Sequence, residues 1–456
     1  MTTDQTDGLR VLFISGLDGD TRRYRCFHHQ EQLALLGKMT GFRESDDPQL
    51  LVDALDYDVF VLHRVPYSRL IGIVIDIAHL RGKPIVFETD DLVFDPGLYE
   101  HIGFVDTLPV EEARKYHDDL KRLAETFILC DCVLTTTQFL ADEARHRGKP
   151  AYVHRNAPSG EMVCISERAY VARRQRLEQG EEESRPVVIA YFSGTGSHNR
   201  DFRVIAEPLI WALKTYPQVL LHVSGHLDLG PEFSPFQARI RRAPYVVWRE
   251  LPHLIAQADI NLAPLEQGNP FCRAKSEIKF VEAALVGVPT IASRIDAHRL
   301  VITDREDGLL VGSPEEWKDA LRTLLDSPER RREIGKAARR TAYAGYMPEQ
   351  RAPQLLGTLQ AIVRQYGSSS ATHEQVLREL AIRVKEYVGH ICIDAQNQEA
   401  QMASLRRTQR KYERQLAVLS QAVEQRDQAI EAIKRGRVMR LMTGMQRWWR
   451  RIKGRN

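Results

Sequence analysis

The sequence predicts an α/β protein with two tandem Rossmann-like domains, followed by a C-terminal α-helical coiled coil. Three observations support this fold class. Short runs of β-branched and aromatic residues alternate with longer amphipathic runs, which indicates parallel strands connected by helices. This alternation stops near residue 157 and starts again at residue 186. From residue 372 onward the strand-like runs are absent, and apolar residues recur in steps of three and four.

The first domain, residues 1–156, is predicted to alternate strands and helices. Val11–Ser15 is the first strand, and Arg23–Leu36 has the periodicity of a helix. Further strands are predicted at Asp58–Leu62, Pro84–Thr89, Cys132–Thr136 and Ala151–His154, and further helices at Tyr67–Arg81, Val110–Cys130 and Gln138–Arg147. Because parallel strands need crossover connections, we expect helices on both faces of the sheet.

The second domain is predicted at residues 186–345. Residues 157–185, which precede it, carry clustered arginines and glutamates, and we expect a solvated linker helix there. Strands are predicted at Pro186–Phe192, Val219–Val223, Tyr245–Trp248, Ile260–Ala263 and Thr290–Ser293, and helices at Asp201–Thr215, Ser276–Val286 and Glu315–Ala344. Residues 346–371 are predicted to form a linker and a helix that crosses back onto the first domain.

A heptad pattern predicts a coiled coil over residues 372–433. The main seam consists of Met402, Leu405, Gln409, Tyr412, Leu416, Leu419, Val423, Arg426, Ile430 and Ile433. An upstream seam from Leu377 to Ile391 joins it through an extra four-residue step. The outer faces are charged throughout, which favours self-association. The alternative is a single amphipathic helix packed on the protein's own body.

The tail, residues 434–456, holds nine Lys or Arg and no acid, whereas the net charge of the whole chain is +3. Its apolar residues, two tryptophans among them, lie on one helical stripe. A basic amphipathic helix of this kind is typical of segments that bind an anionic membrane surface. The alternatives are nucleic-acid binding and a disordered basic end.

The composition is that of a globular protein. Hydrophobic residues make up 43% and charged residues 27% of 456 residues, which excludes wholesale disorder. The small net charge gives no general argument for nucleic-acid binding. The polar N-terminus is unlike a signal peptide, and the longest apolar run, Leu70–Leu80, is too short to span a bilayer. We expect a cytoplasmic protein that lies peripherally on the inner face of the membrane.

The most informative segment is 273–293, which is predicted as a loop, a helix, a Gly-Val-Pro turn and a buried strand. Lys275 and Lys279 are four residues apart and are expected on one face of the helix, beside its N-terminus. Ammonium groups and free backbone N–H groups together favour an anion. Glu282, one turn further, is suited to hold the vicinal hydroxyls of a sugar. The pattern predicts a nucleotide-diphosphate site, although a surface helix with stray lysines is the alternative. The donor-binding candidates in this segment are Arg273, Lys275, Ser276, Lys279 and Glu282.

A second candidate segment opens the second domain, where a strand is followed by a glycine turn and the start of a helix. Gly194 and Gly196 permit close approach to the backbone, and Thr195 offers a hydroxyl donor. Such a turn is common between strands and helices, so it is weak evidence alone. His198 is a basic candidate, with a structural role as the alternative. The donor-binding candidates here are Gly194, Thr195, Gly196 and His198.

In the first domain, candidate residues follow three strands. Gly16 begins a flexible loop at the carboxyl end of the first strand, the edge at which α/β sheets bind ligands. Arg25, in the helix that follows, is a candidate with Gly16 for donor phosphate or an acidic acceptor; the alternative is a solvated basic helix start. The predicted strand Pro84–Thr89 ends in a group of acidic residues, and a histidine follows the preceding strand, Asp58–Leu62. The catalytic candidates, for binding an acceptor hydroxyl or acting as a base, are Asp90, Asp91, Glu88 and His63, with loop capping as the alternative for the acids.

The run Glu282-Ala-Ala-Leu-Val-Gly-Val-Pro-Thr-Ile-Ala-Ser293 resembles the donor-site signature of GT-B glycosyltransferases, in particular glycosyltransferase family 4, also called glycosyl transferases group 1. The resemblance implies that Glu282 binds the ribose of the donor. The family often has a second Glu eight residues earlier, where this chain has Ala274. Tyr24 and Arg25 resemble the Tyr-Arg start of the first helix in many members. The similarity covers roughly residues 9–350 and implies that the first domain binds the acceptor.

We therefore predict a glycosyltransferase that moves a sugar from a nucleotide-diphosphate-sugar to a hydroxyl of a glycan or lipid-linked acceptor, in surface polysaccharide synthesis. The resemblance favours retention of configuration. We expect a metal-independent reaction, because cations and helix N-termini can stabilise the leaving diphosphate. No cofactor is expected, since the nucleotide-sugar is a substrate. Self-association through 372–433 and an anionic membrane surface at 434–456 are the other expected partners, without nucleic acid. The alternative is a non-catalytic glycosyltransferase-like scaffold assembled through its coiled coil.

Overall fold

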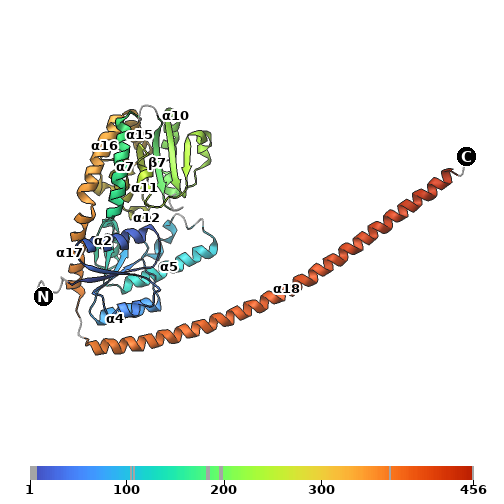
Figure 1. Cartoon of the computed structure of the whole chain (residues 1–456), viewed down its shortest axis with the longest axis horizontal. Coiled ribbons are helices and arrows are strands. Elements are labelled where there is room, and N and C mark those ends of the chain that lie inside the picture. The colour runs from blue at the N-terminus through green and yellow to red at the C-terminus, as the bar shows by residue number, and fades with distance from the viewer. Residues whose placement is uncertain are drawn as a thin grey trace. The chain divides into compact units, whose positions relative to one another are not determined.

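The computed structural model describes residues 8–102, 105, 108–180, 185–194, 199–368 and 371–453. The chain forms two compact units, Met1–Ala381 and Ile382–Asn456. The first unit contains two six-stranded parallel sheets, each with its own helices (Figure 1). This arrangement confirms the predicted pair of α/β domains. The second unit is helical and belongs to one long helix, α18 (His373–Lys453).

The first sheet has the strand order β2-β1-β3-β4-β5-β6, and all its pairs are parallel. Its strands are β1 (Arg10–Ser15), β2 (Met39–Glu44), β3 (Val59–His63), β4 (Ile85–Thr89), β5 (Cys132–Thr135) and β6 (Ala151–Val153). The sequence predicted every one of these except β2. This strand lies at the edge of the sheet, and none of its residues is fully buried, so its sequence lacks the continuous apolar run that marks the central strands.

The helices of the first domain are α1 (Asp20–Arg22), η2 (Arg23–Phe27), α2 (His28–Leu35), α3 (Leu50–Asp53), α4 (Arg69–Leu80), η3 (Pro96–His101), α5 (Val110–Leu129) and α6 (Gln138–His146). The predicted helices correspond to η2 with α2, α4, α5 and α6, whereas α1, α3 and η3 were not predicted. The hydroxyls of Ser68 and Thr137 accept hydrogen bonds from the backbone N–H groups of the first turns of α4 and α6, which explains where these helices begin. The segment η2 is a single π-helical turn that joins α1 to α2.

The second sheet has the strand order β12-β11-β10-β7-β8-β9 and is also parallel. Its strands are β7 (Val187–Ser193), β8 (Val219–Gly225), β9 (Ile240–Ala243), β10 (Ile260–Ala263), β11 (Thr290–Ser293) and β12 (Leu309–Val311). The predicted strand Tyr245–Trp248 is wrong. The strand lies earlier, at β9, and Tyr245 and Val247 are exposed in the segment that follows. The short strand β12 was not predicted.

The helices of the second domain are α7 (Gly160–Glu178), α9 (Asn199–Arg203), α10 (Ala206–Thr215), η6 (Pro231–Arg239), α11 (Leu251–Ile255), α12 (Pro270–Arg273), α13 (Ile278–Leu285), α14 (Asp296–Val301), α15 (Pro314–Asp326) and α16 (Pro328–Gly345). Three predicted helices are corrected. The helix expected at Asp201–Thr215 is divided into α9 and α10. Residues 315–344 form α15 and α16, because Ser327 caps a new helix that Pro328 begins. The helix expected from Ser276 starts only at Ile278.

The expected linker helix, α7, is not solvated. Met162, Ile165 and Ala169 are buried on one side of it. Arg173 is buried as well, and its guanidinium donates a 3.0 Å hydrogen bond to the carbonyl oxygen of Ala256. The charge pattern that indicated a solvated helix therefore describes only its outer face.

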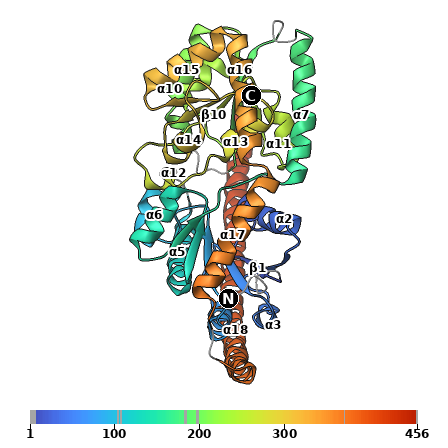
Figure 2. The same ribbon diagram turned by 90° about the vertical axis from the view of Figure 1, so that its left-hand side faces the viewer.

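Helix α17 (Pro348–Tyr366) returns from the second domain to the first. Its residues Leu355, Leu359 and Ile362 belong to the same buried cluster as Val11 and Phe13 of β1. Figure 2 shows α17 leaving α16 and running along the first domain. The first domain is therefore completed by residues that follow the second domain in the sequence.

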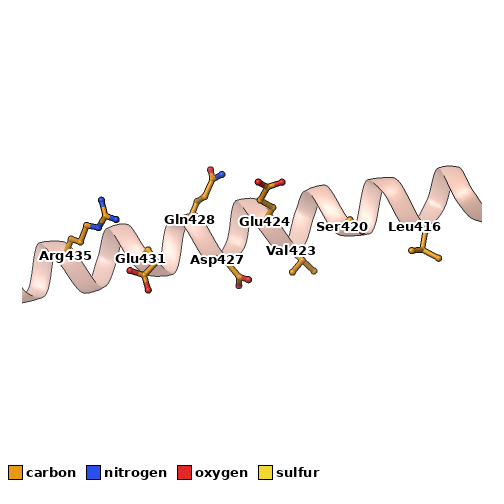
Figure 3. Close-up of a pocket in the computed structure, with 8 residues that line it drawn as sticks. All are labelled: Leu416, Ser420, Val423, Glu424, Asp427, Gln428, Glu431 and Arg435. Carbon is orange, nitrogen blue, oxygen red and sulfur yellow. The ribbon is translucent and has the colours of Figure 1, made fainter.

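Helix α18 carries the predicted heptad seam on one continuous helix. Met402, Leu405, Leu416 and Val423 of the seam are exposed on it. Figure 3 shows Leu416 and Val423 on one side of the helix and Glu424 and Gln428 on the other, along a shallow surface groove. The side chains of Tyr412, Leu419, Ile430 and Ile433, and those of Trp448 and Trp449 in the tail, lie outside the described residues. Over the described part of the chain, no helix is long and apolar enough to cross a membrane.

Candidate functional site

The candidate site lies where the carboxyl ends of β1, β3 and β4 face the start of α13. Hydrogen bonds join the two domains there, and three of them involve residues described below. The hydroxyl of Tyr24 donates to Oε1 of Glu282 at 2.7 Å. Nζ of Lys275 lies 2.7 Å from Oδ1 of Asp91. Nδ2 of Asn156 donates to Oγ of Ser276 at 3.1 Å. The domains are therefore held close by polar groups, several of which the sequence had marked as candidates.

Lys279 and Glu282 lie on the first two turns of α13. Nζ of Lys279 donates to the carbonyl oxygen of Phe192, near the end of β7, and lies 5.3 Å from the centre of the Tyr191 ring. Burial lowers the pKa of Lys279, although Glu282 partly opposes this. Burial also raises the pKa of Glu282. Each group is thus held in a poorly hydrated position where an opposite charge or a hydroxyl would stabilise it.

Lys275 does not share a helix face with Lys279, which corrects the sequence prediction. It lies in the turn between α12 and α13, because α12 ends at Arg273 and α13 begins at Ile278. Burial disfavours the charge of Lys275, but Asp91 outweighs burial and raises its pKa. The two lysines therefore lie on different elements at the domain interface, and α13 itself supplies Lys279 and Glu282.

Arg273 is engaged at the edge of the site. Its Nε donates to Oδ2 of Asp296 on α14 at 3.0 Å, and its guanidinium lies 4.3 Å from the centre of the Phe139 ring in the first domain. Nearly half of its side chain is exposed. This arrangement makes Arg273 a contact between α12, α14 and α6, and a ligand would have to draw it away from Asp296.

Arg25 and Glu88 form an ion pair inside the first domain. Both side chains are fully buried, and Nε of Arg25 lies 2.5 Å from Oε1 of Glu88. Nη1 of Arg25 also donates to the carbonyl oxygen of His154 at 2.8 Å and to Oδ1 of Asn156 at 3.0 Å. Burial, which outweighs Arg25, raises the pKa of Glu88 to about 8. Neither the exposed helix start nor the loop cap considered from the sequence is observed for these two residues.

His63 lies beside this pair and is also fully buried. Ser15 donates its hydroxyl hydrogen to the carbonyl oxygen of Leu17, so its Oγ accepts from Nδ1 of His63, 3.1 Å away. Nε2 of His63 then presents its lone pair toward Oε2 of Glu88, at 3.7 Å. Burial, with Arg64 and Arg25, holds the pKa of His63 well below its usual value. The lowered pKa of His63 and the raised pKa of Glu88 agree with each other, because burial disfavours the charged form of both groups.

Arg64 connects the two remaining acids at the end of β4. Its Nη1 lies 3.5 Å from Oδ1 of Asp90 and 3.3 Å from Oδ2 of Asp91. Gly16 explains how the β1 loop passes this point, because a Cβ there would collide with the backbone oxygen of Arg64. Asp91 therefore contacts Arg64 from its own domain and Lys275 from the other.

The structure brings some of the predicted residues together and separates others. Asp91, Lys275, Tyr24 and Glu282 meet between the domains, whereas Arg25 and Glu88 lie inside the first. Gly194 has open space around its Cα. The candidates Thr195, Gly196 and His198 lie outside the described residues.

Sequence reasoning missed Arg64, Asn156 and Glu277. The position of Asn156, three residues after the last strand of the first domain, is the signal that the sequence offers for it. In the part of the chain that the structure describes, no group of three or more His, Cys, Asp or Glu residues is arranged to hold a metal ion.

Comparisons with known proteins agree with this fold. Residues 202–357 match a family described as glycosyl transferase-like. A D-inositol 3-phosphate glycosyltransferase of Segniliparus rotundus is 34% identical over 87 residues, which is 18% of this chain and 19% of that protein. The same enzyme of Corynebacterium glutamicum is 43% identical over 60 residues, 13% of this chain and 14% of that protein. The chain thus matches only about a fifth or less of the length of these curated relatives.

Solved structures match over about three quarters of the chain. HepE of Anabaena in complex with UDP superimposes with a TM-score of 0.54 at 14% identity, covering 77% of this chain and 100% of that one. Sucrose-phosphate synthase of Thermosynechococcus elongatus gives a TM-score of 0.52 at 15% identity, covering 78% and 100%. The chain therefore has the fold of these GT-B structures. The segment 202–357, which includes residues 273–293, is similar to the glycosyl transferase-like family, in agreement with the resemblance predicted from the sequence.

Proposed function

We propose that the protein is a glycosyltransferase that transfers a sugar from a nucleotide-diphosphate-sugar to a hydroxyl group of a glycan or lipid-linked acceptor. The observation that carries the proposal is the pairing of Lys279 and Glu282 on the first turns of α13, with Tyr24 of the opposite domain on Glu282. HepE, which shares the fold, was solved with UDP and with UDP-glucose, so UDP is the first nucleotide to test.

The charges of these residues suit a departing diphosphate. A diphosphate beside Lys279 would offset the burial that lowers the pKa of this ammonium group. The ammonium group of Lys279 would in turn stabilise the negative charge that develops on the departing diphosphate. This electrostatic stabilisation needs no metal. Ribose hydroxyls would replace the Tyr24 hydroxyl on Glu282. Retention of configuration and a role in surface polysaccharide synthesis belong to the same proposal and rest on the family resemblance.

On the acceptor side, Asp90 and Asp91 are better candidates than Glu88. Glu88 is fully buried and occupied by Arg25, whereas Asp91 reaches the groups of the second domain. A carboxylate next to an acceptor hydroxyl can accept its hydrogen bond or its proton. We therefore assign acceptor contact to Asp90 and Asp91 and leave Glu88 and His63 to support them.

The test compares Lys279→Ala with Lys214→Ala, an exposed lysine on α10, by calorimetric titration of UDP. Loss of one charge-assisted contact is expected to raise the Kd of UDP by about 10- to 100-fold in Lys279→Ala. The Lys214→Ala variant should keep the wild-type Kd. Equal Kd values would remove Lys279 from the diphosphate site. A wild-type protein that binds no UDP and hydrolyses no nucleotide-sugar would favour the scaffold alternative.

We further propose that residues 372–433 self-associate and that residues 434–456 bind an anionic membrane surface. The exposed seam residues Leu405, Leu416 and Val423 support the first part, because an apolar stripe on a lone helix is stabilised by a matching helix. Deleting 434–456 should abolish sedimentation with anionic vesicles and leave the oligomer mass, measured by light scattering, unchanged. Equal sedimentation before and after would refute the membrane role, and a monomeric full-length chain would refute self-association.

A further inference from the structure

The two connections between the domains converge on the start of α13. The first runs from β6 to α7 and contains Arg155. The second runs from α16 to α17 and contains Tyr346. Both residues contact Glu277, the residue immediately before α13. The Tyr346 hydroxyl donates to Oε1 of Glu277 at 2.5 Å, and Nη1 of Arg155 donates to the same oxygen at 3.3 Å.

These contacts form a closed triangle with little access to water. Nη1 of Arg155 also donates to the Tyr346 hydroxyl oxygen at 3.3 Å, and only 2% of the Glu277 surface is exposed. Burial and Glu277 raise the pKa of Tyr346 far above its usual value, so its hydroxyl keeps the proton that it donates. Removing Arg155 or Tyr346 would leave the buried carboxylate of Glu277 with one donor fewer, which costs free energy. The three side chains are therefore held firmly in their positions.

A neighbouring hydrogen bond repeats the same connection. Asn156 follows Arg155 in the chain and donates to Ser276, which precedes Glu277. Two consecutive residues of the first connection therefore contact two consecutive residues before α13. Asn156 in turn accepts from the buried Arg25. The start of α13 is thus fixed to the interior of the first domain as well as to its own domain.

Lys279 and Glu282 follow Glu277 by two and five residues on the same short helix. A displacement of Glu277 therefore moves both groups together. We propose that Arg155, Glu277 and Tyr346 are positioning residues, which couple the angle between the domains to the placement of Lys279 and Glu282. The consequence for ligand binding rests on the proposed function, whereas the coupling of Tyr346 to α13 is independent of it.

The test uses Tyr346→Phe with Tyr343→Phe as a matched control. Tyr343 lies one turn earlier, on α16, and its hydroxyl donates to Oε2 of Glu167 at 2.8 Å and accepts from Arg339 at 3.1 Å. Each variant therefore loses one hydroxyl between a carboxylate and an arginine. Glu167 belongs to α7, and Arg339 donates to the carbonyl oxygen of Leu285, so this control touches the end of α13 and not the segment that begins it.

Hydrogen exchange of the α13 amides is measured first, without ligand. We expect exchange several-fold faster in Tyr346→Phe than in Tyr343→Phe; equal exchange would overturn the coupling. The Kd of UDP is measured next and should rise about tenfold in Tyr346→Phe alone, because the loss of a hydrogen bond to a charged group is transmitted to Lys279 and Glu282. Equal Kd values in the two variants would overturn the positioning role. A wild-type chain that binds no UDP would defeat the proposed function, and the exchange comparison would still decide the coupling.

Discussion

The two sides of the domain interface use polar residues in different ways. On the first-domain side, Arg25, His63 and Glu88 are fully buried and lie against one another. On the second-domain side, Lys279 and Glu282 are half-buried, and their partners are a backbone carbonyl and a tyrosine from the opposite domain. Groups of the first kind hold the ends of strands together. Groups of the second kind can exchange their partners for a ligand, because they are only half-buried.

The largest expected effect follows from breaking the buried pair. Above the pKa of Glu88, at about pH 9, Arg25→Met leaves a buried carboxylate without its partner and should lower the free energy of unfolding by about 3–5 kcal/mol. Urea denaturation measures this change. The double variant Arg25→Met/Glu88→Gln should recover part of the loss. A single variant as stable as the wild type would show that the pair is not structural.

A smaller effect is the pH dependence that Glu88 contributes. Its pKa is raised to about 8 in the folded protein, so between its unfolded pKa and pH 8 the folded state binds the extra proton. Stability from this group therefore falls as pH rises through that window and is level above it. The buried histidines, with lowered pKa values, titrate below about pH 6.5 and act in the opposite direction.

Glu88→Gln isolates this contribution, since the amide cannot titrate. Between about pH 6.5 and 8 the wild type should lose about 2 kcal/mol of unfolding free energy relative to the variant. Denaturation curves at four pH values measure the difference. Parallel pH profiles in the two proteins would contradict the raised pKa of Glu88.

The smallest expected effect concerns the contact between the two sides. Asp91→Asn removes the negative charge that pairs with Lys275. A diphosphate then no longer has to displace Asp91 in order to contact this lysine. The Kd of UDP should fall about two- to fivefold, which is the size expected for a partly exposed ion pair. Asp142→Asn, which releases the exposed Arg145 on α6, is the control and should change nothing. Weaker UDP binding in Asp91→Asn would show that this carboxylate supports the ligand rather than competing with it.

The sequence predicts the central strands well because they are buried on both faces. Val59–His63 is apolar up to its last residue, and Ile85–Thr89 is wholly buried, so each gives a continuous signal. Edge strands give a weaker one. Met39–Glu44 is half-exposed and was missed, and the apolar residues at 245–248 were taken for a strand although they lie after one.

The candidate site was predictable in its residue types but not in its pairings. Glu282 and Lys279 follow from the local signature of the helix that carries them. The burial of Arg25 and the pairing of Lys275 involve groups that lie more than sixty residues away in sequence, Glu88 and Asp91. No local pattern contains that information, because a charged side chain near a strand end has the same sequence signal whether it is solvated or paired inside.

The return of α17 to the first sheet bears on how the chain is made. Leu355, Leu359 and Ile362 leave the ribosome only after the whole second domain has been synthesised. Until then the β1 side of the first sheet lacks part of its apolar cover, while the later domain already has every segment of its own core. Domains generally fold as units during synthesis. Here the domain encoded second is the first able to complete itself, and the N-terminal domain is completed only when α17 has been synthesised.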